Sequence, residues 1–139
     1  MADSAIQTAS LAPGEDIFQR LVPNLGVTSF GVNLLTLEPG RRMRVHKHRR
    51  QEEVYLVLEG ELTLIVEEEP HRLGRWELAR LAPEQRRQLT NPTSERTLVL
   101  AIGGYGEHQG RDGIAWTEWD EGGEGRPPQE VPLPDDAAR

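Results

Sequence analysis

The sequence predicts an all-β fold, a sandwich or barrel of antiparallel strands, and three observations lead to this prediction. Apolar and β-branched runs of strand length recur at intervals of about 8 to 12 residues. Pro, Gly or Asn residues separate most of these runs, as expected for turns between strands. No segment shows the 3.6-residue apolar period of an amphipathic helix over three turns.

The first elements are expected before residue 50. Residues 15–23 (EDIFQRLVP) fit either one helical turn or a short strand that ends before the proline. Residues 28–37 (TSFGVNLLTL) are rich in apolar and β-branched residues and precede the turn signal EPG, so we expect a strand there. Residues 42–48 (RMRVHKH) alternate in character, which predicts a strand with one face toward the interior.

The remaining strands follow at regular spacing, each bounded by Gly, Pro or Asn. Beyond residue 103 the composition changes and the chain becomes rich in glycine. The five strands expected in this part of the chain are 53–60, 61–69, 75–83, 86–91 and 96–104.

Length and composition indicate one domain of 139 residues, of which 36% are apolar. The chain has no cysteine, which excludes disulfides, thiolate metal sites and cysteine nucleophiles. Its N-terminal residues lack the basic start and the apolar region of a secretory signal. The apolar runs are far shorter than the roughly 18 residues that span a membrane. We therefore expect a cytoplasmic protein with no membrane partner.

The domain organisation follows from changes in composition. Residues 1–13 are small and polar and are expected to be a flexible segment. Residues 14–119 form the expected barrel, and Trp116 and Trp119 near its end are expected to cap the core or to pack on a partner. Residues 120–139 are acidic and rich in Pro and Gly, so we expect a disordered or extended tail.

The charge is distributed unevenly along the chain. The net charge is −7, of which residues 118–139 carry −5, whereas residues 41–50 contain six basic groups and no acid. Such a basic patch can attract phosphate or carboxylate groups. It is also typical of a solvated strand edge kept soluble by arginines. Because the patch is short and poor in aromatic residues, no nucleic-acid partner is expected.

A candidate metal site lies in the stretch VHKHRRQEE, residues 45–53. His46 and His48 differ by two positions, so on a strand both rings project from the same face. Glu53 follows a short turn and begins the next strand, and antiparallel pairing would return it to the two histidines. Two imidazoles and one carboxylate suit Fe(II), Mn(II), Zn(II) or Ni(II) and leave coordination positions open for water or substrate.

The spacing of this stretch resembles the first sequence motif of the cupin superfamily. The pattern is Gly40-x5-His46-x-His48-x4-Glu53-x6-Gly60. The apolar run VYLVLEGEL, which begins directly after Glu53, is also typical of that motif. The resemblance covers about half of the chain and implies a double-stranded β-helix, a jelly-roll barrel of two antiparallel sheets. It also implies a divalent metal held inside the barrel by the two histidines and the glutamate, and a homodimer.

The second motif of that family, Gly-x5-Pro-x-Gly-x2-His-x3-Asn, is largely absent. Counting back from Asn91, the first glycine is replaced by Trp76, the proline by Ala82, the second glycine by Glu84 and the histidine by Arg87. The missing histidine is the fourth metal ligand of the family. No histidine lies between residues 75 and 107, and the two that flank this range, His71 and His108, are expected to be exposed to solvent.

Arg87 cannot ligate a metal, because a guanidinium stays protonated and has no lone pair to offer. Three arrangements remain open for this side chain. It can bind an anionic substrate bidentately beside the metal, pair with Glu53 in a metal-free pocket, or swing to the mouth of the barrel. Tyr55 has the same strand parity as Glu53 and Arg44 the same parity as His46, so both are further candidates for ligand binding.

Three functions fit these residues, and the sequence identifies no catalytic residue that would choose between an enzyme and a binding module. The first is a metal-dependent cupin that binds a small anionic or oxygen-rich organic ligand. The second is a metal-free, non-catalytic sensor or interaction module in which Arg87 pairs with Glu53. The third is a metal-free isomerase or epimerase with His46 or His48 as general base and Tyr55 as its partner.

Overall fold

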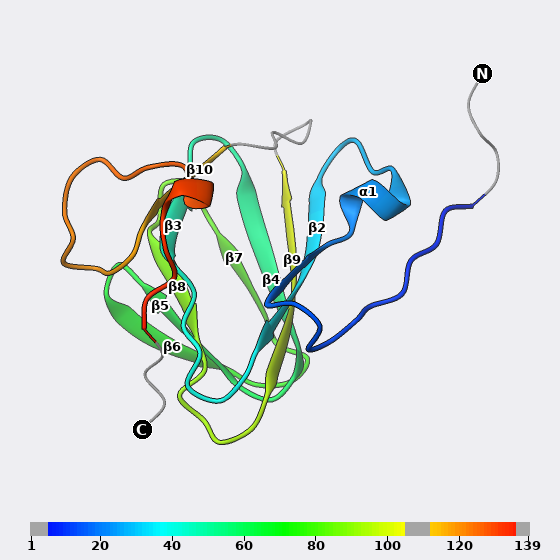
Figure 1. The fold of residues 1–139 in the computed structure, drawn as a ribbon, viewed down its shortest axis with the longest axis horizontal. Coiled ribbons are helices and arrows are strands. Elements are labelled where there is room, and N and C mark those ends of the chain that lie inside the picture. Colours follow the sequence, from blue (N-terminus) through cyan, green and yellow to red (C-terminus); the bar gives the residue numbers. More distant parts are fainter. Residues whose placement is uncertain (1–5, 105–111, 136–139) are drawn as a thin grey trace.

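Two five-stranded antiparallel sheets face each other and enclose the core (Figure 1). The structure, a computed structural model, describes residues 6–104 and 112–135. This architecture confirms the predicted all-β fold, a jelly-roll or double-stranded β-helix barrel. No helix within the described ranges is long and apolar enough to cross a membrane. The elements are β1 (Phe18–Arg20), α1 (Val22–Leu25), β2 (Gly31–Leu37), β3 (Val45–His48), β4 (Glu52–Glu59), β5 (Leu62–Val66), β6 (Glu69–Leu73), β7 (Leu78–Leu81), β8 (Arg87–Thr90), β9 (Thr97–Gly104), β10 (Gly113–Trp116) and the 3-10 helix η1 (Pro128–Glu130).

The strand order places consecutive strands in opposite sheets at the centre of the barrel. One sheet has the order β1-β2-β9-β4-β7 and the other has the order β10-β3-β8-β5-β6. The turn between β3 and β4 therefore leads from one sheet to the other, as in jelly rolls. As a result, side chains on the inner faces of β3 and β4 meet inside the barrel.

Strand β4 shows how alternation sets the register of the sheet. Tyr55 and Val57 point inward and are fully buried, whereas Val54, Leu56 and Leu58 point outward and are half-buried. A one-residue shift would exchange these faces and expose the buried set, so the register is strongly specified. The homodimer that the family resemblance implies stays a prediction. The buried apolar cluster consists of Leu35, Leu37, Met43, Tyr55, Val57, Leu62, Leu64, Leu81, Leu89, Val99 and Ala101.

The glycine that ends the first motif is required by the turn after β4. Gly60 has a φ angle of 75°, in the left-handed region that side chains rarely adopt. A Cβ atom at this position would lie 2.3 Å from the carbonyl oxygen of Arg96. Both the backbone conformation and the close neighbour therefore exclude a larger residue.

The prediction of one strand over residues 61–69 is wrong, because the chain turns within this range. Strand β5 ends at Val66, and a two-residue turn of Glu67 and Glu68 leads into β6. Both glutamates have positive φ angles, 47° and 68°. Tight hairpin turns of this kind usually contain Asn or Gly, so the sequence carried no signal for the turn. Strand β10, which follows the glycine-rich part of the chain, was also not predicted.

Residues 120–135, for which the composition predicts a disordered or extended tail, have little regular structure but contact the barrel. Val131 is 2% exposed, and Trp116 donates a hydrogen bond to the carbonyl oxygen of Gly123. Arg44 Nε donates to the carbonyl oxygen of Val131, and Arg42 donates to that of Asp135. Two arginines of the basic patch thus hold the backbone of the C-terminal segment. These hydrogen bonds add to the stabilisation that comes from the few apolar groups that the segment buries. The last four residues, 136–139, lie outside the described part.

The docking of this segment can be tested by replacing Val131 with alanine. We expect the free energy of unfolding to fall by about 2 kcal/mol, because two buried methyl groups are lost from a packed site. Denaturant unfolding followed by circular dichroism measures the change. Ile6→Ala is the matched control, since Ile6 is 86% exposed. Equal effects of the two substitutions would show that the C-terminal segment does not pack on the barrel.

Candidate metal centre

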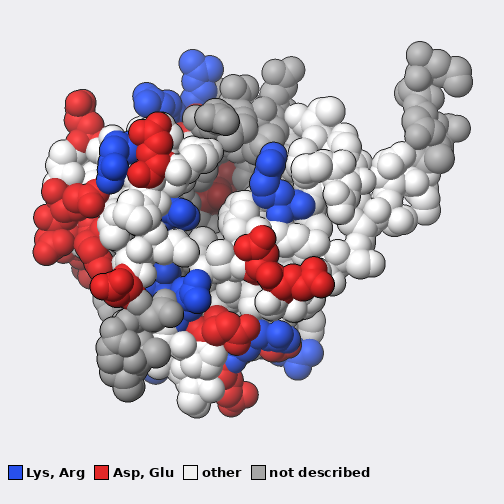
Figure 2. All heavy atoms as spheres, in the orientation of Figure 1, with Lys and Arg blue, Asp and Glu red and all other residues white. Residues whose placement is uncertain are grey.

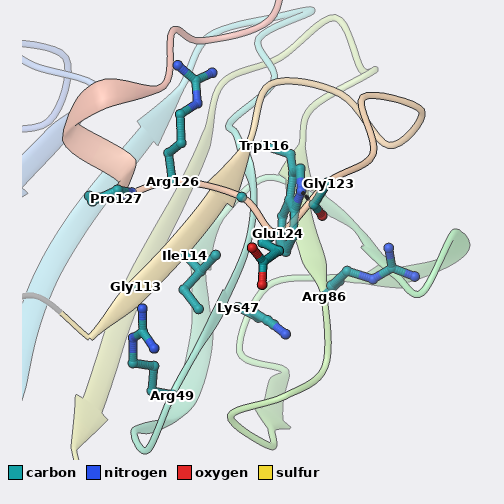
Figure 3. Close-up of a pocket in the computed structure, with 11 residues that line it drawn as sticks. Lys47, Arg49, Arg86, Gly113, Ile114, Trp116, Gly123, Glu124, Arg126 and Pro127 are labelled. Carbon is teal, nitrogen blue, oxygen red and sulfur yellow. Dashed lines mark hydrogen bonds between the residues drawn. The ribbon is translucent and has the colours of Figure 1, made fainter.

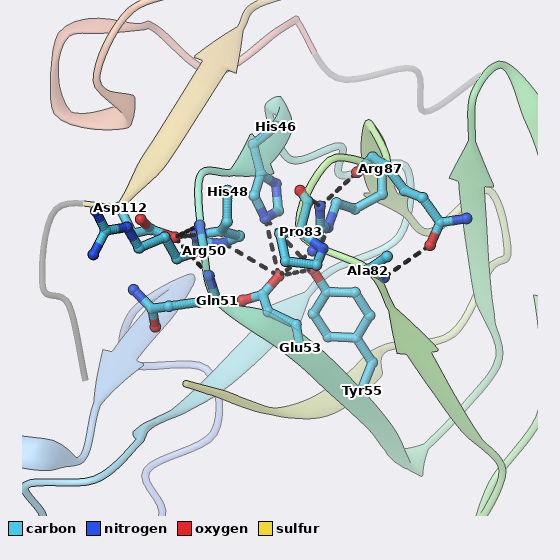
Figure 4. Close-up of polar contacts among 11 residues, drawn as sticks. His46, His48, Arg50, Gln51, Glu53, Tyr55, Ala82, Pro83, Arg87 and Asp112 are labelled. Atoms are coloured by element: carbon cyan, nitrogen blue, oxygen red, sulfur yellow. Dashed lines mark hydrogen bonds and ion pairs between the residues drawn. The ribbon is translucent and has the colours of Figure 1, made fainter. Parts of the chain in front are cut away.

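His46 and His48 on β3 and Glu53 on β4 converge on one point inside the barrel (Figure 4). Glu53 Oε1 lies 3.2 Å from His46 Nε2 and 3.4 Å from His48 Nε2. Two ligand atoms that each bind a metal at about 2.1 Å lie roughly 3.0 to 3.4 Å apart, depending on coordination geometry. The structure therefore brings the three predicted ligands together at distances that suit one divalent transition metal.

A glycine on the neighbouring strand makes room for the carboxylate. Gly103 on β9 pairs with Glu53 in the sheet register. A Cβ atom on Gly103 would lie 3.0 Å from Cγ of Glu53, which is tighter than ordinary van der Waals contact. The absence of a side chain at this position thus lets Glu53 keep its place beside the histidines.

The nitrogen atoms of His48 add a second observation that fits a metal. Nε2 is buried and makes no hydrogen bond with any residue in the described ranges. A buried polar atom without a partner is costly, and native structures usually provide one. Neutral imidazole nitrogens and a carboxylate are donors that bind Fe, Mn, Zn and Ni. The donor set therefore fits the expected metal, and its binding here stays a prediction.

Arg87 lies directly behind the glutamate and points inward, with 0% of its side chain exposed. Its Nη2 atom is 3.3 Å from Glu53 Oε1, so the two form a buried ion pair. Its Nη1 atom donates to the carbonyl oxygens of Gln85, at 2.5 Å, and Pro83, at 3.3 Å. Of the three arrangements that the sequence left open for Arg87, the one at the barrel mouth is excluded, because these carbonyls and Glu53 hold the guanidinium inside.

Tyr55 connects the glutamate with the arginine. Its hydroxyl donates to Glu53 Oε1 at 2.5 Å and accepts a hydrogen bond from Arg87 Nε at 3.3 Å. Burial and the nearby Glu53 charge raise the pKa of Tyr55 well above its usual value, so the phenol stays protonated and acts as a donor. The phenol of Tyr55 thus donates its hydrogen bond to Glu53, one of the three candidate metal ligands.

The electrostatics of two candidate ligands, Glu53 and His46, favour the protonation states that bind a metal. Burial raises the pKa of Glu53, but its close contacts with His46 and His48 outweigh this effect and hold that pKa well below its usual range. Burial also lowers the pKa of His46, which favours the neutral imidazole. An ionised carboxylate beside a neutral imidazole is the form in which both groups can bind a cation.

Asp112 is a neighbour of the site that sequence reasoning missed. It is 6% exposed, and its Oδ2 atom accepts hydrogen bonds from the backbone N–H groups of Arg50 and Gln51. The same oxygen lies 3.6 Å from Nδ1 of His48. Asp112 is 61 residues away from Gln51 along the chain. In the sequence, an aspartate before a glycine indicates only a turn.

A cavity of about 710 Å³ opens beside the site. Its lining includes His46, His48, Glu53 and Tyr55, together with Arg44 near the C-terminal segment. Figure 2 shows a hollow on this face of the molecule with Lys and Arg atoms on either side. Arg87 is not among the residues that line the cavity. Of the three residues predicted to bind a ligand, Tyr55 and Arg44 therefore lie at the cavity, and their contact with a ligand stays a prediction.

A second hollow, of about 620 Å³, lies outside the barrel against β3 and β10. Its lining includes Arg49, Arg86 and Arg126, which point in different directions (Figure 3). Arg86 is already paired with Glu67 at 2.9 Å. These charges do not converge on one ligand. His71 is exposed, as expected. His108 lies outside the described residues.

Comparison with known proteins agrees with this architecture. The family model described as "Cupin domain" matches residues 33–103. No curated protein matches the sequence.

Solved structures supply further similarity. A cupin protein from Bacteroides fragilis is 26% identical, with a TM-score of 0.67 over 74% of this chain and 86% of the other. A sugar phosphate isomerase of the cupin superfamily from Silicibacter pomeroyi is 25% identical, with a TM-score of 0.63 over 97% of this chain and 95% of the other. A Cupin 2 conserved barrel domain protein from Salinispora arenicola shares the fold at 23% identity, with a TM-score of 0.63 over 73% and 90% of the two chains. Because the family model covers residues 33–103, slightly more than half of the sequence, this chain belongs to the cupin family.

Proposed function

We propose that this protein binds one divalent transition metal through His46, His48 and Glu53, and uses it to hold a small, oxygen-rich anion such as a phosphorylated sugar. The observation that carries this proposal is the convergence of three ligand atoms beside an open cavity. Fe, Mn, Zn and Ni all suit two imidazoles and a carboxylate.

The residues around the metal position would have separate roles. A bound metal supplies a Lewis acid that polarises a carbonyl or hydroxyl oxygen of the ligand. Tyr55 holds the Glu53 carboxylate in place through its short hydrogen bond. Arg44 stands at the cavity and would orient the anionic group of the ligand. Apolar residues of the lining, such as Met43 and Leu89, exclude water from the ligand.

Three observations support the phosphorylated-sugar class. The Silicibacter pomeroyi protein called a sugar phosphate isomerase is similar over almost the whole length of both chains. The cavity has the volume of a small-molecule site, which usually lies between about 300 and 1,000 Å³. Within the described ranges, Arg44 donates only through Nε, to Val131, so its terminal Nη groups are available to an anion.

Calorimetric titration of the metal-loaded protein tests this proposal. Desalted protein should retain close to one equivalent of metal and bind an aldose phosphate more tightly than the same sugar without phosphate. Arg44→Gln should weaken binding of the phosphorylated ligand by roughly tenfold, because a charge-assisted contact is lost. Arg49→Gln is the matched control, since Arg49 belongs to the same basic patch but lines the outer hollow.

Two results would contradict the proposal at different levels. Protein that holds well under one equivalent of every metal tested would rule out the metal centre. Equal affinity for phosphorylated and unphosphorylated sugars, with and without Arg44, would rule out the proposed ligand class while leaving the metal centre intact. Conversion of aldose phosphate to ketose phosphate, followed by NMR, would extend the proposal from binding to catalysis.

A second candidate function is a metal-free binding protein. The observation that favours it is the buried contact of 3.3 Å between Arg87 and Glu53. In this arrangement the guanidinium takes over the electrostatic role of the metal. The effect of exchanging Arg87 for histidine separates the two candidates.

A further inference from the structure

The carboxylate of Asp112 lies beside the candidate ligands without belonging to them (Figure 4). We propose that Asp112 is a positioning residue of the metal centre. It holds the proton of His48 on Nδ1, so that Nε2 offers its lone pair to the metal. This inference rests on the proposed metal-binding function.

The position of the Asp112 carboxylate is set by the backbone around it. Oδ2 accepts hydrogen bonds from the N–H groups of Arg50, at 2.9 Å, and Gln51, at 2.8 Å. The main chain of Asp112 accepts a further hydrogen bond from Arg49 N at 3.0 Å. Because Asp112 is 6% exposed, little water competes for the carboxylate. These contacts give the negative charge one fixed place relative to the turn between β3 and β4.

Strand pairing brings this fixed charge to the histidine ring. Gly113, the next residue, pairs with His48 in the register of β10 and β3. The Oδ2 atom then lies 3.6 Å from His48 Nδ1. This distance exceeds a hydrogen bond of about 3.2 Å, so the contact is electrostatic, and a ring shift of roughly half an ångström would make it a hydrogen bond.

Both ring nitrogens of His48 are buried and make no hydrogen bond with the residues that the structure describes. Nδ1 faces the carboxylate of Asp112, and Nε2 faces the side occupied by Glu53. A neutral imidazole carries one proton and one lone pair. The negative charge of Asp112 attracts the proton to Nδ1, which leaves the lone pair of Nε2 pointing at the metal position. This placement suits a metal held by Nε2 and Glu53, whose carboxylate would otherwise face the lone pair at 3.4 Å.

The loss of metal affinity expected on replacing Asp112 can be judged from carboxylates with the same role in other metal sites. Carboxylates that fix the orientation of a metal-binding histidine typically change metal affinity by about 10- to 100-fold when they are replaced. They act by orienting the ring and by making it a stronger donor. We expect the same range for Asp112.

Asp112→Asn tests the proposal while keeping the turn intact. The amide oxygen can still accept from the backbone N–H groups of Arg50 and Gln51, but the negative charge is gone. We expect the unfolding temperature of the metal-free protein to stay near that of the wild type. We expect the affinity for Zn(II) or Mn(II), measured by competition with a chromophoric chelator, to fall by about 10- to 100-fold.

Glu77→Gln is the matched control. Glu77 also accepts a backbone hydrogen bond through its carboxylate, from Gly74 N at 2.6 Å, but it is exposed and lies in another turn. This variant should bind metal as the wild type does. Wild-type affinity in Asp112→Asn, or the same loss in both variants, would overturn the proposal.

A second measurement needs no metal. It uses the Glu53→Leu/Arg87→Leu protein, which lacks the carboxylate that faces Nε2 of His48. At alkaline pH, where imidazoles are neutral, ¹⁵N NMR distinguishes the two tautomers of His48, assigned with an added His48→Gln substitution. His48 should carry the proton on Nδ1, and adding Asp112→Asn should shift it toward Nε2. A proton on Nε2 while Asp112 is still present would overturn the role of Asp112. If the wild type fails to bind any metal but this protein shows the expected tautomer, the proposed function fails and the placement of the proton by Asp112 stands.

Discussion

Replacing Arg87 with histidine is expected to raise the divalent-metal affinity of this protein by at least about 100-fold. Arg87 pairs with His46 in the register of β8 and β3, and its guanidinium lies 3.3 Å from Glu53 Oε1. Two like unit charges 4 Å apart repel by about 4 kcal/mol at an effective dielectric constant of roughly 20. Histidine removes this repulsion and adds a nitrogen ligand beside the other three.

Isothermal titration with Mn(II) and Zn(II) measures the change. Arg86→His is the matched control, since Arg86 is the preceding residue but points outward and pairs with Glu67. A wild type without metal affinity and a binding Arg87→His variant would favour the metal-free function, in which Arg87 replaces the cation. Unchanged affinity in the variant would contradict the placement of Arg87 at the fourth ligand position.

Exchanging Glu53 for glutamine is expected to affect both metal binding and stability. Metal affinity should fall by at least about 100-fold, because a charged metal ligand is lost. This loss is larger than the one expected for a residue that only orients a ligand, such as Asp112. The metal-free protein should lose roughly 3 kcal/mol of unfolding free energy, because Arg87 is left as a buried cation without its anion. For a chain of this size the unfolding temperature then falls by about 10 °C.

The stability effect of Glu53 should depend on pH in one direction. The pKa of Glu53 in the folded protein lies well below the value of 4.5 for an unperturbed glutamate. Its ionised form therefore stabilises the fold above pH 4.5, and this contribution is lost as the pH falls from there toward the lowered pKa. The difference between the metal-free wild type and Glu53→Gln should accordingly narrow in acid, as thermal unfolding at several pH values would show.

Glu52→Gln provides the control for both effects. Glu52 is adjacent in sequence, but it is exposed and pairs with Arg80 on the outer face of the sheet at 2.7 Å. Its replacement should change the unfolding free energy by less than about 0.5 kcal/mol and leave metal binding as it was. Combining Glu53→Leu with Arg87→Leu should recover most of the stability without metal affinity, because both buried charges are removed. A Glu53→Gln variant that still binds metal at wild-type strength would exclude this residue as a ligand.

Local geometry explains which parts of the site were predictable from the sequence. The spacing of His46 and His48 places both rings on one face of any strand. Tyr55 follows Glu53 by two positions and shares its face for the same reason. Turn glycines and alternating residues likewise predicted the barrel. The turn at Glu67 and Glu68 was missed because neither residue type indicates positive φ angles.

The amino-acid order thus predicted an antiparallel sandwich or barrel and the three candidate ligands, since both depend on periods and spacings of a few residues. The jelly-roll arrangement followed from the resemblance to the cupin motif. The partners of those ligands arise from strand pairing and depend on contacts between distant segments. Asp112 reaches His48 because β10 pairs with β3, and Arg87 meets Glu53 because β8 and β4 face the same interior. Val131 is buried because two arginines of the basic patch hold the C-terminal segment. No local pattern encodes such contacts, because their energy comes from burial and charge between residues far apart in the chain.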